Sequence, residues 1–498
     1  MNRNEALGRL AETERKELAL RHAMGILMLD GETAAPKHSA KGRGETMAFL
    51  AGLQHALLTD GALGEALGLL KQETLDKRDE RRVQILSEQR EDLTLVPADE
   101  YAAYERLLTE AGSVWHEAKL KSDFQSFAPY LTQITAYNRR FAERKNASKP
   151  AYDVLLDTYE RGANMADLDV FFERLSQGLS PLIREIEAMP ERDAPFLHQR
   201  YPAEEQRRFA HRLMALEGIS EEDCALAESE HPFTDAYNRH DVRITTHYYE
   251  EDVLSSLYSV LHEGGHALYE LGSGEDLEGT VLSGGATMGI HESQSRFYEN
   301  IIGRSRPFCE VLLPLMREGF PKQTEGLDSE TLYRMVNRSK PSLIRTEADE
   351  LTYSLHVAVR YEIEKGLVMG SLKVTEVPGE WNRLMREKLG VTVPDDRRGA
   401  LQDSHWSGGS IGYFPSYALG SAYGAQMLSV MQRTVNVWDA VGTGDLSGVT
   451  GWLRERIHRH GNLLTPQELL KNALEGPFDV QYYIDYLTDK FTELYGIR

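Results

Sequence analysis

The stretch from Ser259 to Gly272, SVLHEGGHALYELG, holds the residues of this sequence that are best suited to chemistry. His262 and His266 are four positions apart, so on a helix their side chains lie one above the other on the same face. Two such histidines supply two nitrogen ligands for a zinc ion. Glu263 lies one position further round the helix, where its carboxylate reaches a water molecule beside the metal and suits a general base.

Gly264 and Gly265 lie in the middle of this expected helix, where each costs about 1 kcal/mol relative to alanine. Our interpretation is that substrate backbone passes close to this surface, where any Cβ would collide with it. Asp252 is expected to cap the start of the helix, and Gly272 is expected to close it.

Catalytic zinc sites usually have a third protein ligand, for which the segment GATMGIHESQSRFYENIIG is the candidate region. This segment is expected to form a helix from near Ile290 to Gly303. His291 and Glu292 are both possible ligands in its first turn. We favour Glu292, which gives a site of two histidines and one carboxylate.

The elements that must position these residues are mostly helices, because apolar residues recur at helical spacing along most of the 498 residues. The length predicts a single catalytic unit of two intimate lobes. Within it we expect a mainly helical part (1–230), a motif-bearing active-site region (231–420) and C-terminal helices (421–498). Strands are expected only at Asp241–Tyr249 and, more briefly, in GTVLSGG near Gly279.

Composition excludes several classes of protein. The net charge of −22 argues against a nucleic-acid partner, which needs a basic surface. The sequence has no run of about 18 apolar residues, so no membrane span is expected. The first residues do not resemble a secretory signal. The two cysteines, Cys224 and Cys309, exclude a disulfide framework and a cysteine metal cluster, and they fit a cytoplasmic location.

Several motifs together resemble the thermostable carboxypeptidase Taq family of zinc metallocarboxypeptidases, which are HEXXH gluzincins. The resemblance rests on HEGGH with HESQ, HPF (His231–Phe233), DVRIT (Asp241–Thr245), IRTEAD (Ile344–Asp349), GALQDSHW (Gly399–Trp406) and GYFPSYALG (Gly412–Gly420). It implies an elongated helical fold with a deep central cleft, similar to angiotensin-converting enzyme and neurolysin. It also implies a homodimer that removes single residues from peptide C-termini with broad specificity.

The resemblance assigns His405 as the active-site histidine, able to donate to the oxyanion of the scissile carbonyl. Either Tyr413 or Tyr417 could stabilise the same oxyanion, and the sequence does not choose between them. Asp349 and Asp403 are candidate acceptors for the second ring nitrogens of the metal-binding histidines.

An exopeptidase must also recognise the free carboxylate of its substrate, which a planar guanidinium binds with two hydrogen bonds. Arg345 resembles the family's arginine in that role, and Arg243 is the second candidate. For either arginine, a structural ion pair with a neighbouring acid is the alternative.

The sequence therefore predicts a zinc carboxypeptidase with metal ligands His262, His266 and Glu292 and with Glu263 as the general base. Cobalt or manganese could replace zinc, because histidine and carboxylate ligands do not discriminate sharply. Peptides with a free C-terminal carboxylate are the expected partners. A zinc oligoendopeptidase with a cleft open at both ends is the main alternative, and a helical scaffold without activity is another.

Overall fold

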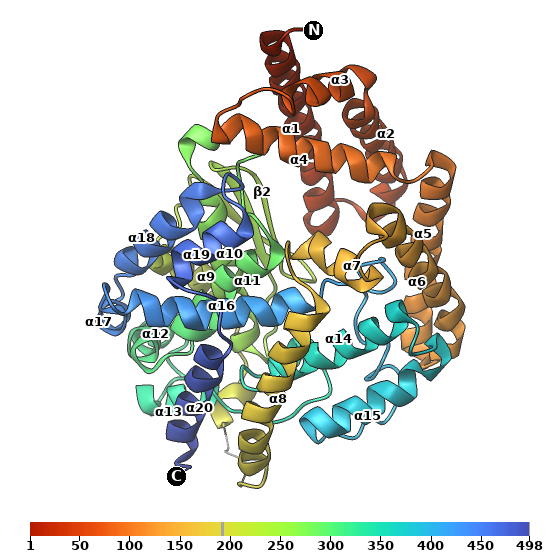
Figure 1. Cartoon of the computed structure of the whole chain (residues 1–498). Helices are drawn as coiled ribbons and strands as arrows, with labels where there is room; N and C mark the ends of the chain where they lie inside the picture. Colours follow the sequence, from red (N-terminus) through yellow and green to blue (C-terminus); the bar gives the residue numbers. More distant parts are fainter. Residues whose placement is uncertain (191–193, 498) are drawn as a thin grey trace.

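Most of the chain folds into helices, and a short sheet separates the earlier helices from the later ones along the sequence. In the computed structural model, which describes residues 1–190 and 194–497, the first helix begins at a capping box. There the Asn2 side chain accepts from the Glu5 backbone N–H at 3.0 Å, and the Glu5 carboxylate accepts from the Asn2 N–H at 2.8 Å. The chain is mostly helical, as the sequence predicts (Figure 1).

Nine α-helices precede the sheet in the described residues; α1 to α4 form the top of the molecule in Figure 1, and α5 and α6 lie on its right side. They are α1 (Arg3–Thr33), α2 (Ala40–Thr59), α3 (Gly61–Leu70), α4 (Lys77–Thr94), α5 (Ala98–Lys121), α6 (Phe124–Asn146), α7 (Ala151–Tyr159), α8 (Met165–Glu187) and α9 (Ala203–Glu217). Helices α1 to α4 bury an apolar cluster of their own, which includes Leu10, Leu63 and Leu86 and ends against Val281. The remaining helices share the main core.

The sheet has three strands in the order β1-β3-β2. Strand β1 (Cys224–Glu228) runs parallel to β3 (Asp241–Thr246), and β2 (Thr234–Asn238) runs antiparallel to β3 on its other side. The predicted strand at Asp241–Tyr249 is thus present but ends three residues earlier. The strand predicted in GTVLSGG was wrong, because that segment forms turns.

The helices after the sheet contain the metal-ligating motifs and the C-terminal region. They are α10 (Val253–Leu271), α11 (Met288–Arg296), α12 (Arg306–Gly319), α13 (Ser329–Val336), α14 (Tyr353–Met369), α15 (Val377–Leu389), α16 (Pro415–Met431), α17 (Val437–Thr443), α18 (Ser447–Arg456), α19 (Pro466–Leu474) and α20 (Gln481–Tyr495). A π-helical turn, η4 (Phe297–Ile302), continues α11 directly. The helix expected from Ile290 to Gly303 therefore exists, with a change of helix type inside it.

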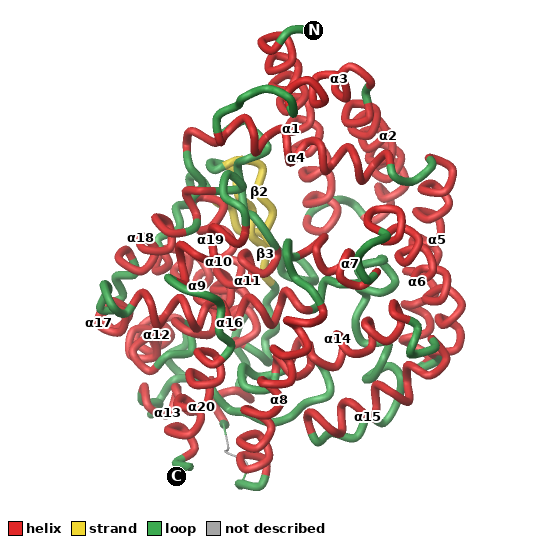
Figure 2. Tube along the Cα trace, viewed as in Figure 1, coloured by secondary structure: helices red, strands yellow, loops and turns green. Residues whose placement is uncertain are grey.

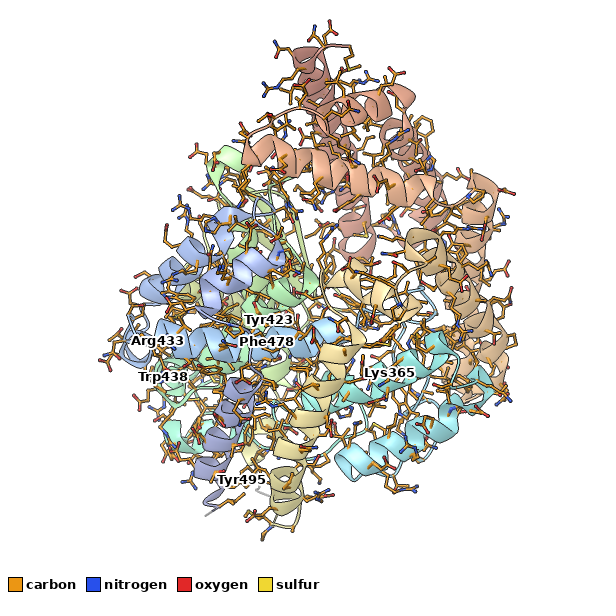
Figure 3. The ribbon with its side chains drawn as sticks, viewed as in Figure 1. Lys365, Tyr423, Arg433, Trp438, Phe478 and Tyr495 are labelled. Atoms are coloured by element: carbon orange, nitrogen blue, oxygen red, sulfur yellow. The ribbon has the colours of Figure 1, made fainter. Side chains whose placement is uncertain are left out.

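Helices α10, α11 and α16 pack together in the middle of the molecule, and β2 and β3 lie against α10 (Figure 2). Gly420 allows α16 to approach α11 closely, since a Cβ there would lie 2.7 Å from the side chain of Glu292. Further along α16, Tyr423 packs edge to face on Phe478, with ring centroids 4.9 Å apart (Figure 3).

Within the described residues, no helix is both long and apolar enough to cross a membrane. Cys224 and Cys309 are both buried and free, so neither takes part in a disulfide.

Candidate active site

Three side chains converge between α10 and α11. The Nε2 atoms of His262 and His266 lie 3.7 Å and 3.6 Å from Oε2 of Glu292. Ligand atoms around a tetrahedral zinc ion, each about 2.1 Å from it, lie about 3.4 Å from one another. The donor set and its spacing therefore fit a divalent metal ion, and the structure brings together the three ligands that the sequence singles out.

The two glycines of the HEGGH motif serve packing between helices. A Cβ on Gly265 would lie 2.5 Å from the carbonyl oxygen of Gln294 in α11, and a Cβ on Gly264 would collide with the carboxylate of Glu217 at the end of α9. Our interpretation that substrate approaches these glycines was wrong. Gly265 lets α11 lie close enough to α10 for Glu292 to meet the two histidines, and Gly264 leaves room for the Glu217 side chain of α9.

The outer ring nitrogens of both histidines are held by side chains that the sequence analysis did not assign to this role. Nδ1 of His262 lies 2.8 Å from Oε2 of Glu299, and Nδ1 of His266 lies 2.6 Å from Nδ1 of His291. Nε2 of His291 in turn lies 2.8 Å from Glu270. Such contacts fix the rings and leave both Nε2 atoms facing the metal position. His291, the alternative third ligand, instead orients His266.

Arg296 holds the carboxylate ligand in place. Its Nε donates to Oε1 of Glu292 at 2.7 Å, and its Nη1 donates to Glu299 at 3.0 Å, while its guanidinium lies 4.1 Å from the ring centroid of Tyr353. Burial alone would raise the pKa of Glu292, but the charges of Arg296 and His262 hold it well below its usual range. Glu292 is therefore ionised, and its Oε2, which also lies 3.1 Å from the hydroxyl of Ser295, faces the two histidine nitrogens.

Glu263 lies on the same helix and is buried. Its Oε2 accepts a hydrogen bond of 2.6 Å from the hydroxyl of Thr234, at the start of β2. Burial raises the pKa of Glu263, while His262 and the Thr234 hydrogen bond oppose that rise. A carboxylate with a raised pKa beside a metal position suits proton transfer.

A second group of side chains comes from the QDSHW segment and the start of α16. Nε2 of His405 lies 3.0 Å from the hydroxyl of Tyr417, and the ring of His405 stacks on that of Tyr413 with centroids 5.7 Å apart. Burial, followed by the nearby charge of Arg345, lowers the pKa of His405 to about 4 against the opposing effect of Asp403. Burial raises the pKa of Tyr413 to about 12. All three side chains are therefore neutral hydrogen-bonding groups.

Residues 9–491 of the sequence match a family model described as carboxypeptidase Taq (M32) metallopeptidase. The chain belongs to the M32 carboxypeptidase family. It is similar to carboxypeptidase 1 of Bacillus subtilis, with 38% identity over 95% of both chains. It is also similar to thermostable carboxypeptidase 1 of Thermus thermophilus, with 35% identity over 100% of both chains.

Solved structures of the family have the same fold. The crystal structure of the M32 carboxypeptidase from Deinococcus radiodurans superposes with a TM-score of 0.96 at 34% identity, covering 99% of this chain and 100% of the other. The Pyrococcus furiosus carboxypeptidase superposes with a TM-score of 0.95 at 34% identity, covering 99% of each chain. The chain is therefore an enzyme, a metallocarboxypeptidase that acts on peptides.

In this M32 carboxypeptidase, Arg345 is buried beside His405. Its Nη2 donates to Asp403 at 2.8 Å, its Nη1 donates to the hydroxyl of Tyr353 at 3.0 Å, and its guanidinium lies 4.9 Å from the ring centroid of Tyr417. Arg345 thus lies next to both groups of side chains in the site, because Tyr353 also contacts Arg296.

The sequence-based prediction that Asp349 and Asp403 accept hydrogen bonds from the second ring nitrogens of the two histidines was wrong. Asp403 binds Arg345 and Arg360 with its two carboxylate oxygens. Asp349 accepts from Ser339 and Thr352. The acceptors are instead Glu299 and, through His291, Glu270. The sequence carried a signal for Glu270, which lies four residues after His266 and shares its helix face.

Arg243 lies on β3, and its Nε donates to Asp241 at 2.5 Å. That contact is the structural ion pair considered as the alternative to substrate binding. The side chain is about a third exposed, at 36%.

Proposed function

We propose that this M32 carboxypeptidase binds zinc and removes single residues from the C-termini of peptides with broad specificity. The observation that carries the proposal is that Nε2 of His262 and Nε2 of His266, from the helix that also holds the buried carboxylate of Glu263, both lie within 3.7 Å of Oε2 of Glu292. Cobalt or manganese is expected to support activity as well, because the same ligands accept them.

When bound, the metal ion polarises the scissile carbonyl and makes water a better nucleophile. Glu263 takes a proton from the attacking water and then passes it to the nitrogen of the departing amino acid. Glu299 and His291 keep the ring nitrogens of His262 and His266 oriented during both steps.

Hydrogen-bond donors for the oxyanion come from the side chains around His405 in this proposal. Because burial and the neighbouring arginine keep His405 neutral, its ring has one N–H to donate. Its Nε2 already contacts the hydroxyl of Tyr417, so the two side chains act as one unit. We assign the oxyanion contact to this pair, with Tyr413 stacked beside it.

Arg345 binds the terminal carboxylate of the substrate in this proposal. Arg345 and the fully buried Arg360 share the single carboxylate of Asp403, so their pairing leaves a net positive charge. A substrate carboxylate would balance that charge. Arg243 remains the second candidate, although Asp241 already pairs with it.

The wider architecture follows the same resemblance. We propose a deep central cleft between two lobes, of the kind in angiotensin-converting enzyme and neurolysin, and a homodimer located in the cytoplasm. The separate apolar cluster of α1 to α4 supports the division into lobes.

One peptide in two forms tests the proposed function. A zinc-loaded sample is incubated with the free acid and with the C-terminal amide, and the masses of the products are followed. A ladder of single-residue losses from the acid alone is expected. Equal internal cleavage of both peptides would instead show an oligoendopeptidase and would remove the role of Arg345. Glu263→Gln should keep the metal and lose several orders of magnitude in turnover.

A further inference from the structure

Thr234 makes the closest hydrogen bond to the proposed general base. Its Oγ1 lies 2.6 Å from Oε2 of Glu263 and 3.1 Å from the backbone oxygen of the same residue. A hydroxyl has a single proton, and a carboxylate is the stronger acceptor. The proton therefore goes to Oε2, which leaves Oε1 of Glu263 without this partner.

The position of Thr234 is fixed by residues of the HPF and DVRIT motifs. Phe233 donates its backbone N–H to Oγ1 of Thr245 at 2.9 Å, and the N–H of Thr245 donates to the carbonyl of Phe233 at 2.9 Å. The hydroxyl of Ser229 lies 2.7 Å from the same Oγ1. Thr245 is fully buried. Thr234, the residue after Phe233, pairs with Ile244 of β3. The two motifs thus hold Thr234, the first residue of β2, in place.

We propose that Thr234 is a positioning residue for catalysis, which holds one carboxylate oxygen of Glu263 so that the other is aimed at the attacking water. The inference rests on the proposed function, in which Glu263 is the general base. It gives the HPF and DVRIT motifs a role, which is to fix Thr234 against α10. Because a glutamate side chain has three rotatable bonds, an anchored carboxylate is a better aligned base than a free one.

In this proposal the proton of the water goes to Oε1 of Glu263 and then to the departing amine. The proton of Thr234 stays on its own oxygen. Thr234 therefore takes no part in the proton transfer itself, and in this proposal it acts through Glu263.

The test compares Thr234→Val, which keeps the shape and removes the hydroxyl, with Thr234→Ser, which keeps the hydroxyl. Valine should lower kcat roughly 10-fold to 100-fold, as loss of a hydrogen bond to a charged group predicts, with KM and bound zinc unchanged. Serine should restore kcat to within about threefold of the original enzyme. Full activity of Thr234→Val, loss of its zinc, or equal damage by serine would overturn the inference.

Thr246→Val is the control, because Thr246 is a threonine of the same sheet whose hydroxyl, among the described residues, reaches only the Ser256 carbonyl, at 3.5 Å. Its turnover should stay near that of the original enzyme. A loss as large as that of Thr234→Val would show a general effect of the sheet and would contradict a specific role for Thr234.

Double variants separate this inference from the proposed function. In a Glu263→Gln background, Thr234→Val should cause no further loss, since its partner has already been disabled. If Glu263→Gln alone kept full turnover, the general-base assignment would fail. If Glu263→Gln were inactive while Thr234→Val were fully active, only the role of Thr234 would fail.

Thr245→Val tests whether the HPF and DVRIT motifs hold Thr234 in place. It should lower kcat by less than Thr234→Val does, and the double variant Thr234→Val/Thr245→Val should be no slower than Thr234→Val alone. Additive losses would show that Thr245 does not act through Thr234, and they would overturn the role given to the two motifs.

Discussion

Nδ1 of His262 lies 2.8 Å from Oε2 of Glu299, a carboxylate that belongs to the π-helical turn directly after α11. The same carboxylate accepts from Arg296, which also binds Glu292. One short segment thus supplies a proposed metal ligand, the residue that orients a second proposed ligand, and the arginine that joins them. Departures from the α-helix often occur at functional sites, and here the π-helical turn contains Glu299.

Glu299→Ala should weaken metal binding about 10-fold to 100-fold, because the ring of His262 loses the acceptor that orients it. Competition with a chromophoric chelator measures the affinity. Glu310→Ala, on the exposed side of α12, is the control and should bind metal normally. Unchanged affinity in Glu299→Ala would mean that this contact does not support the metal site.

Gly265→Ala should destabilise the enzyme by about 1–3 kcal/mol and weaken metal binding, because the new Cβ meets the backbone of α11. Urea unfolding and zinc titration measure the two effects. Gly8→Ala is the control, since Gly8 lies within α1 with no other atom within 4 Å of the Cβ position. That variant should be slightly more stable, because alanine favours helix. A neutral Gly265→Ala would contradict the packing role of the glycine.

The buried carboxylate of Glu160 should make the free energy of unfolding depend on pH. Its carboxylate accepts from the Gly289 N–H at 2.8 Å, at the start of α11, and burial raises its pKa to about 7. The folded state therefore holds this proton more tightly than the unfolded chain, whose pKa is near 4.5. The contribution to the free energy of unfolding is full below pH 4.5 and falls as the pH rises to about 7, by about 3 kcal/mol in all.

Glu160→Gln has no proton to lose, so its stability relative to the original enzyme should improve between pH 4.5 and pH 7 and stay level above that. Urea denaturation at pH 5 and pH 8 measures the difference. The same stability difference at both pH values would show that Glu160 is not the group responsible. Glu310→Gln, exposed on α12, should show no such change.

Removal of metal should abolish turnover while leaving the helical circular dichroism spectrum unchanged, because the ligands lie on helices that pack against the main core. Zinc at 100 times its dissociation constant should restore activity and add about 2.7 kcal/mol of stability. His262→Ala should show no stabilisation by zinc. An equal rise in the melting temperature of that variant would place the binding elsewhere.

The helical character and the pairing of His262 with His266 could be predicted from sequence because both depend on local spacing, whereas the position of Glu292 depends on the packing of α11 against α10. Asp252 caps α10 and Gly272 ends it, as predicted, and His262 and His266 share a face of that helix for reasons internal to it. Strands β1 and β2 were missed. Their sequences, CALAE and TDAYN, show little apolar alternation, and they exist because β3 provides a partner for each.

The purpose of the glycines could not be predicted, because it depends on contacts with Gln294 and Glu217, which lie on other helices. The partners of Asp403 were missed for the same reason. Arg345 and Arg360 come from separate segments, and only the fold brings both to one carboxylate.

Helix α16 presents Tyr417 near its start, and one turn later it presses Gly420 against Glu292. The phenol and the metal ligand are therefore spaced by the pitch of a single helix rather than by a flexible loop. A sliding motion of α16 would carry Tyr417 and push on Glu292 at the same time. The distance between the proposed oxyanion donor and the metal position is thus set by the backbone of α16. A substitution that tilts α16 would move Tyr417 and alter the contact with Glu292 together.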